Sequence, residues 1–181
     1  MIPFGDPSAS YQAHKAEIDQ AIKRVLDSGW YVLGTEVDAF EYEVASFHGK
    51  DLHAVGVANG TDAISLCLRS LGHGLGDEVI TASHTAVATV AGIEQAGCSP
   101  VFADIDPVSR CIDPRSIEER VGPKTRAIMP VHIYGQPAEM HKILEIGKAH
   151  QLEVVEDCSQ AHGAEINGQK VGTFANLSAF S

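Results

Sequence analysis

The 181-residue sequence has little positive charge: 13 lysines and arginines stand against 24 aspartates and glutamates, giving a formal net charge of -11 at pH 7. Nucleic acids and anionic membranes bind to basic surfaces, so neither is expected as a partner. No apolar run approaches membrane-spanning length, and the N-terminus lacks the basic start and apolar run of a signal peptide. We therefore expect a cytoplasmic protein.

Motifs for metal and nucleophile chemistry are also missing. The four cysteines form no CxxC pair and show no metal-like spacing. Three of them lie in apolar stretches, where cysteine is usually a small core residue, and this indicates a reducing compartment. The nine histidines include no HExxH pair, and no GxSxG motif occurs. The sequence predicts no metal site.

What the sequence does contain is an alternation of strands and helices. Residues 1–50 predict a helical N-terminal arm, and residues 51–181 predict one α/β domain. Because the apolar runs are continuous, we expect a mostly parallel sheet covered by helices on both faces. The predicted strands are 54–58, 78–81, 100–103, 127–131 and 153–156, with a further strand beginning near 176. The predicted helices between them are 62–71, 86–96, 114–121 and 138–150.

In an open parallel sheet, ligands bind in the loops that follow the strands. The first such loop contains Asn59, Gly60, Thr61 and Asp62. Its glycine permits close backbone approach, its threonine supplies a hydroxyl, and the following helix N-terminus is suited to a phosphate. An ordinary helix start capped by Asn59 or Thr61 fits these residues equally well.

Two acids, Glu156 and Asp157, stand at the end of the fifth predicted strand and are followed by amide and imidazole groups. A buried carboxylate at a strand end needs a cationic partner, and a protonated pyridine nitrogen would be one. The alternative is a surface turn in which Asp157 caps a helix. His84, in the loop after the second strand, either contacts a ligand or is a satisfied loop histidine.

Six blocks, in this order and spacing, resemble the DegT/DnrJ/StrS family of pyridoxal-phosphate (PLP)-dependent sugar aminotransferases, which have the aspartate aminotransferase-like fold (fold type I). The resemblance runs from Ile2 to Ser181. The blocks are 29–34 (GWYVLG), 59–63 (NGTDA), 76–80 (GDEVI), 97–106 (GCSPVFADID), 130–135 (PVHIYG) and 156–164 (EDCSQAHGA).

The resemblance implies that Gly60, Thr61 and Asp62 hold the PLP phosphate. Ser181 resembles the serine that opens the family's Ser-Phe-x-Pro-x-Lys segment and also contacts the phosphate. The lysine of that segment forms the Schiff base with PLP, and it is expected about five residues beyond Ser181. The catalytic residue is therefore expected outside this sequence, and the 181 residues alone are expected to be inactive.

The resemblance also assigns residues around the cofactor ring. Asp157 matches the acid that pairs with the pyridinium nitrogen, and Gln160 matches the residue that reaches the ring's 3-oxygen. Many members place a stacking aromatic residue where this chain has Ala86. His84 is therefore a secondary candidate for contact with the ring.

The activity implied is amino transfer, commonly from glutamate or glutamine, to a nucleotide-linked keto-deoxysugar in amino-sugar biosynthesis for polysaccharides or antibiotics. A homodimer is expected, because the family's active sites lie at a homodimer interface. Two alternatives remain open. One is a PLP-dependent deoxysugar dehydratase, in which histidine replaces the lysine. The other is a catalytically inactive chain that binds PLP or completes a partner's site.

Overall fold

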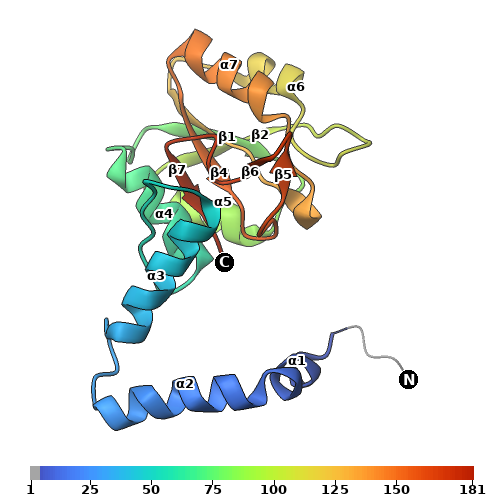
Figure 1. Cartoon of the computed structure of the whole chain (residues 1–181). Coiled ribbons are helices and arrows are strands. Elements are labelled where there is room, and N and C mark those ends of the chain that lie inside the picture. Colours follow the sequence, from blue (N-terminus) through green and yellow to red (C-terminus); the bar gives the residue numbers. More distant parts are fainter. Residues whose placement is uncertain (1–4) are drawn as a thin grey trace. The chain divides into compact units, whose positions relative to one another are not determined.

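The computed structural model describes residues 5–181, which separate into two compact units with the boundary between Gly56 and Val57 (Figure 1). The first unit is helical. None of its described helical residues is buried, so its fold provides no closed apolar core. The helices are α1 (Pro7–Ala13), α2 (Lys15–Ser28) and α3 (Thr35–His48).

Local signals set the ends of these helices. The Asp6 carboxylate accepts a hydrogen bond from the Ala9 N–H at 3.0 Å and so caps α1. Gly29 adopts φ 66° and ends α2, since a left-handed residue is most easily supplied by glycine. No helix among the described residues is long and apolar enough to cross a membrane.

The second unit contains a five-stranded parallel sheet in the order β2-β1-β3-β4-β7. The fold class predicted from the sequence is confirmed. The strands of this sheet are β1 (Glu78–Ala82), β2 (Ser99–Ala103), β3 (Thr125–Met129), β4 (Glu153–Asp157) and β7 (Leu177–Ala179). A separate hairpin is formed by β5 (Glu165–Ile166) and β6 (Gln169–Lys170).

Helices cover both faces of the sheet, with α4 and α5 on one side and α6 and α7 on the other (Figure 1). They are α4 (Gly60–Ser70), α5 (Val87–Gln95), α6 (Pro114–Arg120) and α7 (Met140–His150), and a short 3-10 turn, η1 (Ile133–Gly135), follows β3. Successive strand residues point to opposite faces. Accordingly, Val155 packs in the core under α4 and α5, while Val154 packs in the core under α6 and α7.

One predicted strand is wrong. Residues 54–58 form no regular structure, although the other predicted strands and helices agree with the structure to within a few residues. The run has no neighbouring strand to pair with, and Val55 is largely exposed. The Gly56 N–H instead donates to the Glu41 carboxylate at 2.6 Å. Apolar composition alone favoured a strand here, but pairing within a sheet is what stabilises one.

Candidate functional site

Asp157 is the last residue of β4 and is only 3% exposed. Its Oδ2 accepts from the Thr89 hydroxyl at 2.7 Å, and its Oδ1 accepts from the Ser159 hydroxyl at 2.7 Å and the Ser159 N–H at 3.1 Å. Because the Thr89 hydroxyl donates to Asp157, the Thr85 hydroxyl at 2.8 Å donates to Thr89. The carboxylate is thus fixed at the end of the strand, on the α4 and α5 side of the sheet.

Gln160 and His84 are linked through Tyr134, which lies in η1. The Gln160 Oε1 accepts from the Tyr134 N–H at 2.8 Å. Since an N–H can only donate, this bond fixes the orientation of the amide and leaves its NH₂ group as a donor. The Tyr134 Oη lies 3.1 Å from the His84 Nε2, and the two ring centroids are 5.8 Å apart. Hydrogen bonds therefore join the three loops that follow β1, β3 and β4. These loops lie at the carboxyl ends of the strands, and we call this region of the sheet the strand-end edge.

Tyr134 adopts φ 57°. A bulky residue in this left-handed conformation is strained by about 1–3 kcal/mol, and such strain persists where surrounding contacts impose it. Here the contacts are those of its N–H with Gln160 and of its hydroxyl with His84. Tyr134 is nevertheless 70% exposed. The strained backbone of Tyr134 is therefore held by the contacts at this strand-end edge and not by packing in the core.

The N-terminus of α4 lies against Ser181, which follows Phe180 just after the end of β7. A Cβ placed on Gly60 would lie 2.6 Å from the Cβ of Ser181 and 2.9 Å from its Oγ, so only glycine fits there. Asn59 is the N-cap, since its Oδ1 accepts from the Asp62 N–H at 2.9 Å. Helix geometry leaves the first N–H groups of α4 without intrahelical acceptors. Gly60 and Ser181 thus lie together at the positive end of α4, where Thr61 is the next helical residue, and we call these three residues the seat.

The Asp62 carboxylate is engaged inside the protein. Its Oδ2 accepts from the Asn59 amide at 2.9 Å, and its Oδ1 accepts from the Gln95 amide at 2.8 Å. Asp62 therefore links the start of α4 to the end of α5, and in this way it helps to fix the position of the seat.

Residues 12–181 match the DegT/DnrJ/EryC1/StrS aminotransferase family. The chain belongs to this family. It is 47% identical, over its whole length, to half of a dTDP-3-amino-3,6-dideoxy-alpha-D-galactopyranose transaminase from Aneurinibacillus thermoaerophilus. It is 46% identical, over 99% of its length, to 47% of a dTDP-3-amino-3,4,6-trideoxy-alpha-D-glucose transaminase from Streptomyces venezuelae.

A solved structure agrees with these relatives. The S. venezuelae DesV structure, in complex with a ketimine intermediate, superposes with a TM-score of 0.95 at 45% identity. That match covers 99% of this chain and 48% of DesV. The chain spans about half the length of the curated relatives it matches.

Sequence reasoning missed three residues that take part in the contacts at the strand-end edge: Thr89, Ser159 and Tyr134. Ser159 carried a usable signal, because an Asp followed two residues later by a serine is a common turn in which the acid accepts local donors. Thr89 carried none, since a threonine in the first turn of a helix is ordinary. Tyr134 lay inside a block shared with the family, but its backbone strain is not visible in sequence.

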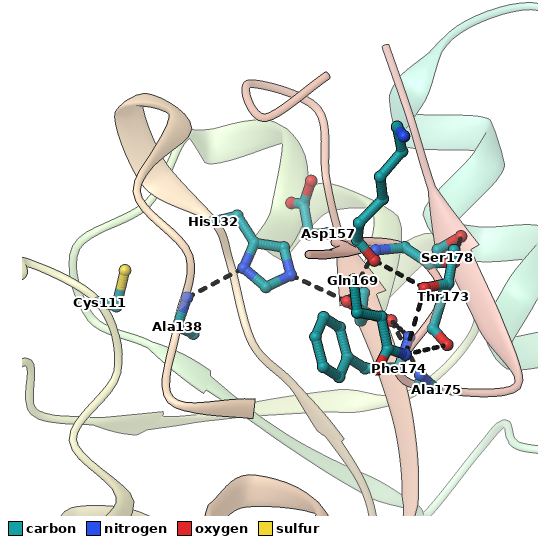
Figure 2. Close-up of polar contacts among 12 residues, drawn as sticks. Cys111, His132, Ala138, Asp157, Gln169, Thr173, Phe174, Ala175 and Ser178 are labelled. Atoms are coloured by element: carbon teal, nitrogen blue, oxygen red, sulfur yellow. Dashed lines mark hydrogen bonds and ion pairs between the residues drawn. The ribbon is translucent and has the colours of Figure 1, made fainter. Parts of the chain in front are cut away.

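A second polar cluster lies beside this edge, where ligand atoms of His132, Glu156 and Cys158 fall within 4.8 Å of one another. Both nitrogens of His132 have protein partners, the Ala138 N–H at 3.0 Å and the Glu156 carboxylate at 3.1 Å (Figure 2). Burial, and then the charges of Glu156 and Asp157, raise the pKa of the Cys158 thiol far above its usual range. Because the His132 nitrogens and the Glu156 oxygens already have hydrogen-bond partners within the protein, we interpret this cluster as a structural anchor.

Proposed function

We propose that the chain is the cofactor-binding part of a PLP-dependent aminotransferase that acts on a nucleotide-linked keto-deoxysugar. The observation that carries the proposal is the Asp157 carboxylate, buried at the end of a parallel strand and oriented by Thr89 and Ser159. Relatives that match nearly the whole chain are transaminases of dTDP-linked amino sugars. Similar relatives carry UDP and GDP in their names, so we leave the nucleotide open.

The residues of the strand-end edge fit the polar groups of PLP. The seat formed by Gly60, Thr61 and Ser181 suits the phosphate, because it combines a helix N-terminus with two hydroxyl side chains, and Gly60 lets Ser181 approach that helix closely. Asp157 supplies the negative charge that a protonated pyridine nitrogen requires. The free NH₂ of Gln160 is a donor for the ring's 3-oxygen. His84, joined to Tyr134, is the candidate for contact with the ring face.

When bound, PLP supplies an electron sink for the negative charge that develops on a substrate carbon. The chain's own residues set the conditions for this chemistry. Asp157 holds a proton at the pyridine nitrogen, and the donors from Thr89 and Ser159 keep its oxygens from turning away. The NH₂ group of Gln160 would donate to the 3-oxygen and so help to orient the ring.

Amino transfer itself, with glutamate or glutamine as donor, is proposed for the whole protein. The Schiff-base lysine is expected about five residues beyond Ser181. Lysine there would favour transfer, whereas histidine would favour dehydration. We also propose a homodimer, in which a second copy completes the site.

The experiment is a titration of the purified chain with PLP, followed by visible absorption. We expect a saturable spectral change that Asp157→Asn weakens by about tenfold or more, since a hydrogen bond to a charged group contributes about 1.5–3 kcal/mol. Asp77→Asn is the matched control: Asp77 precedes β1 at the opposite end of the sheet, where it accepts from the Gly74 N–H at 3.0 Å. Absence of saturable binding by the unaltered chain would refute cofactor binding by this part of the protein.

A further inference from the structure

Glu156 is the neighbour of Asp157 on β4, and the proposed cofactor contacts do not use it. Its side chain points to the opposite face of the sheet, as Val154 does two residues earlier. It is completely buried. A buried carboxylate is costly unless nearby donors satisfy it, so its partners indicate what it does.

Backbone amides of one turn provide most of these partners (Figure 2). The Glu156 Oε1 accepts from the Phe174 N–H at 2.9 Å and the Ala175 N–H at 2.8 Å, and its Oε2 accepts from the Gly172 N–H at 2.8 Å. A carboxylate that gathers successive N–H groups fixes the backbone that carries them. We call residues 172–175 the anchored turn.

His132 completes the set of donors. Its Nδ1 accepts from the Ala138 N–H at 3.0 Å, so the proton of the neutral ring lies on Nε2 and is donated to the Glu156 Oε2 at 3.1 Å. Every group that these contacts bring to the carboxylate is therefore a donor. An acceptor-only group matches this environment, and an amide in the same place would not.

The anchored turn leads into β7 and from there to the cofactor seat. The Ser178 hydroxyl donates to the Gly172 carbonyl at 3.0 Å, which ties β7 back to the turn. Gly172 lies directly against the ring of Phe180, leaving no room for a Cβ. Phe180 is followed by Ser181, which lies against Gly60 at the start of α4. One continuous set of contacts thus joins Glu156 to the proposed phosphate seat.

We infer that Glu156 is a positioning residue for the phosphate of the cofactor. By binding the anchored turn, it holds β7 and Ser181 against the N-terminus of α4, on the far side of the sheet from its own carboxylate. The inference rests on the proposed function, since it concerns the seat assigned there to the PLP phosphate.

The test is Glu156→Gln in the full chain. Glutamine preserves the shape of the side chain but turns an NH₂ group toward N–H donors, so the two contacts at one oxygen position are lost. Hydrogen exchange should quicken in residues 172–175 and leave β1 and β3 unchanged. Glu153→Gln, at the exposed start of the same strand, is the matched control.

Two ligands separate positioning from general loss of structure: PLP, and pyridoxal, which lacks the phosphate. We expect Glu156→Gln to weaken PLP binding by about tenfold, equivalent to about 1.4 kcal/mol, while pyridoxal binding is unchanged. Equal losses for both ligands, or an unchanged PLP affinity, would overturn the inference. If the unaltered chain binds no PLP, the proposed function fails; if it binds PLP and Glu156→Gln causes no loss specific to PLP, the inference alone fails.

Ser178→Ala is a milder variant on the same path, should the Glu156→Gln chain fold poorly. It removes the hydroxyl that ties β7 to Gly172 and leaves Glu156 intact. We expect a smaller loss, about threefold in PLP affinity, with pyridoxal binding again unchanged. A Ser178→Ala chain that loses both affinities equally would count against the inference.

Discussion

Asp157 and Glu156 are adjacent buried carboxylates on one strand, and they differ in what binds them. Asp157 is held by two side-chain hydroxyls, those of Thr89 on α5 and of Ser159, and by the Ser159 N–H. Glu156 is held by three backbone amides of a distant turn and by His132. Hydroxyls can rotate toward other acceptors, whereas the amides of a fixed turn cannot.

The difference shows how one strand can serve both a ligand and the fold. The side facing α4 and α5 carries a charge whose partners can adjust to a bound group. On the side facing α6 and α7, the charged carboxylate of Glu156 has its hydrogen-bond donors fixed within the protein. We therefore expect changes at Asp157 to act mainly on cofactor binding, and changes at Glu156 to act on stability as well.

The largest expected effect comes from removing each carboxylate in turn. Glu156→Ala leaves the three turn amides and His132 without their acceptor and should lower the free energy of unfolding by about 3–5 kcal/mol. Asp157→Ala should cost less, about 1–3 kcal/mol, because the Thr89 and Ser159 hydroxyls can reorient. Urea denaturation measures both values. A larger cost for Asp157→Ala than for Glu156→Ala would break the comparison.

Glu153→Ala, at the exposed start of β4, is the control for these two variants. It should change the free energy of unfolding by no more than about 0.5 kcal/mol, as surface substitutions usually do.

The sequence allowed prediction of much of the fold, because continuous apolar runs and the helices between them have physical periods that can be read directly. It also identified Asp157 as a residue whose burial needs an explanation. It did not predict the role of Glu156, since the two acids look equivalent in sequence. Their difference arises from strand alternation and from a turn some 16 residues later, whose amides carry no sequence signal.

The failure at residues 54–58 has a related cause. Whether an apolar run becomes a strand depends on the presence of a neighbouring strand, which is a property of the whole sheet. The cofactor-binding roles that strand-end position and family resemblance assigned remain predictions; they concern Gly60, Thr61, Asp62, His84, Asp157, Gln160 and Ser181. Their geometry is consistent with those roles, and measured PLP affinities of site variants would test them.

A smaller effect, confined to the ligand, is expected from Gln160→Glu. One oxygen of the new carboxylate can still accept from the Tyr134 N–H, while the other replaces the NH₂ donor with a negative charge. We expect PLP affinity to fall by about tenfold, because that charge would face the 3-oxygen of the ring, and stability to change little. Gln12→Glu, on an exposed face of α1, controls for the added charge. Unchanged PLP affinity would remove Gln160 from the proposed site.

A last effect, confined to alkaline pH, comes from Cys158, the next residue along from the two acids. Burial raises its pKa in the folded chain above the ordinary 9.0, so the stabilisation is fully present below pH 9.0 and is lost as the pH rises and the unfolded thiol ionises. The loss should approach about 1.4 kcal/mol per pH unit above that point.

Urea denaturation between pH 7 and pH 10.5 (about 1.5 units above the ordinary thiol value) measures this loss. Cys158→Ala should reduce the alkaline slope of the unfolding free energy against pH by the contribution of one thiol. The contributions of the three other cysteines should remain. Identical slopes would mean that solvent reaches the Cys158 thiol, and that the end of β4 is less closed than the hydrogen bonds of the two carboxylates indicate.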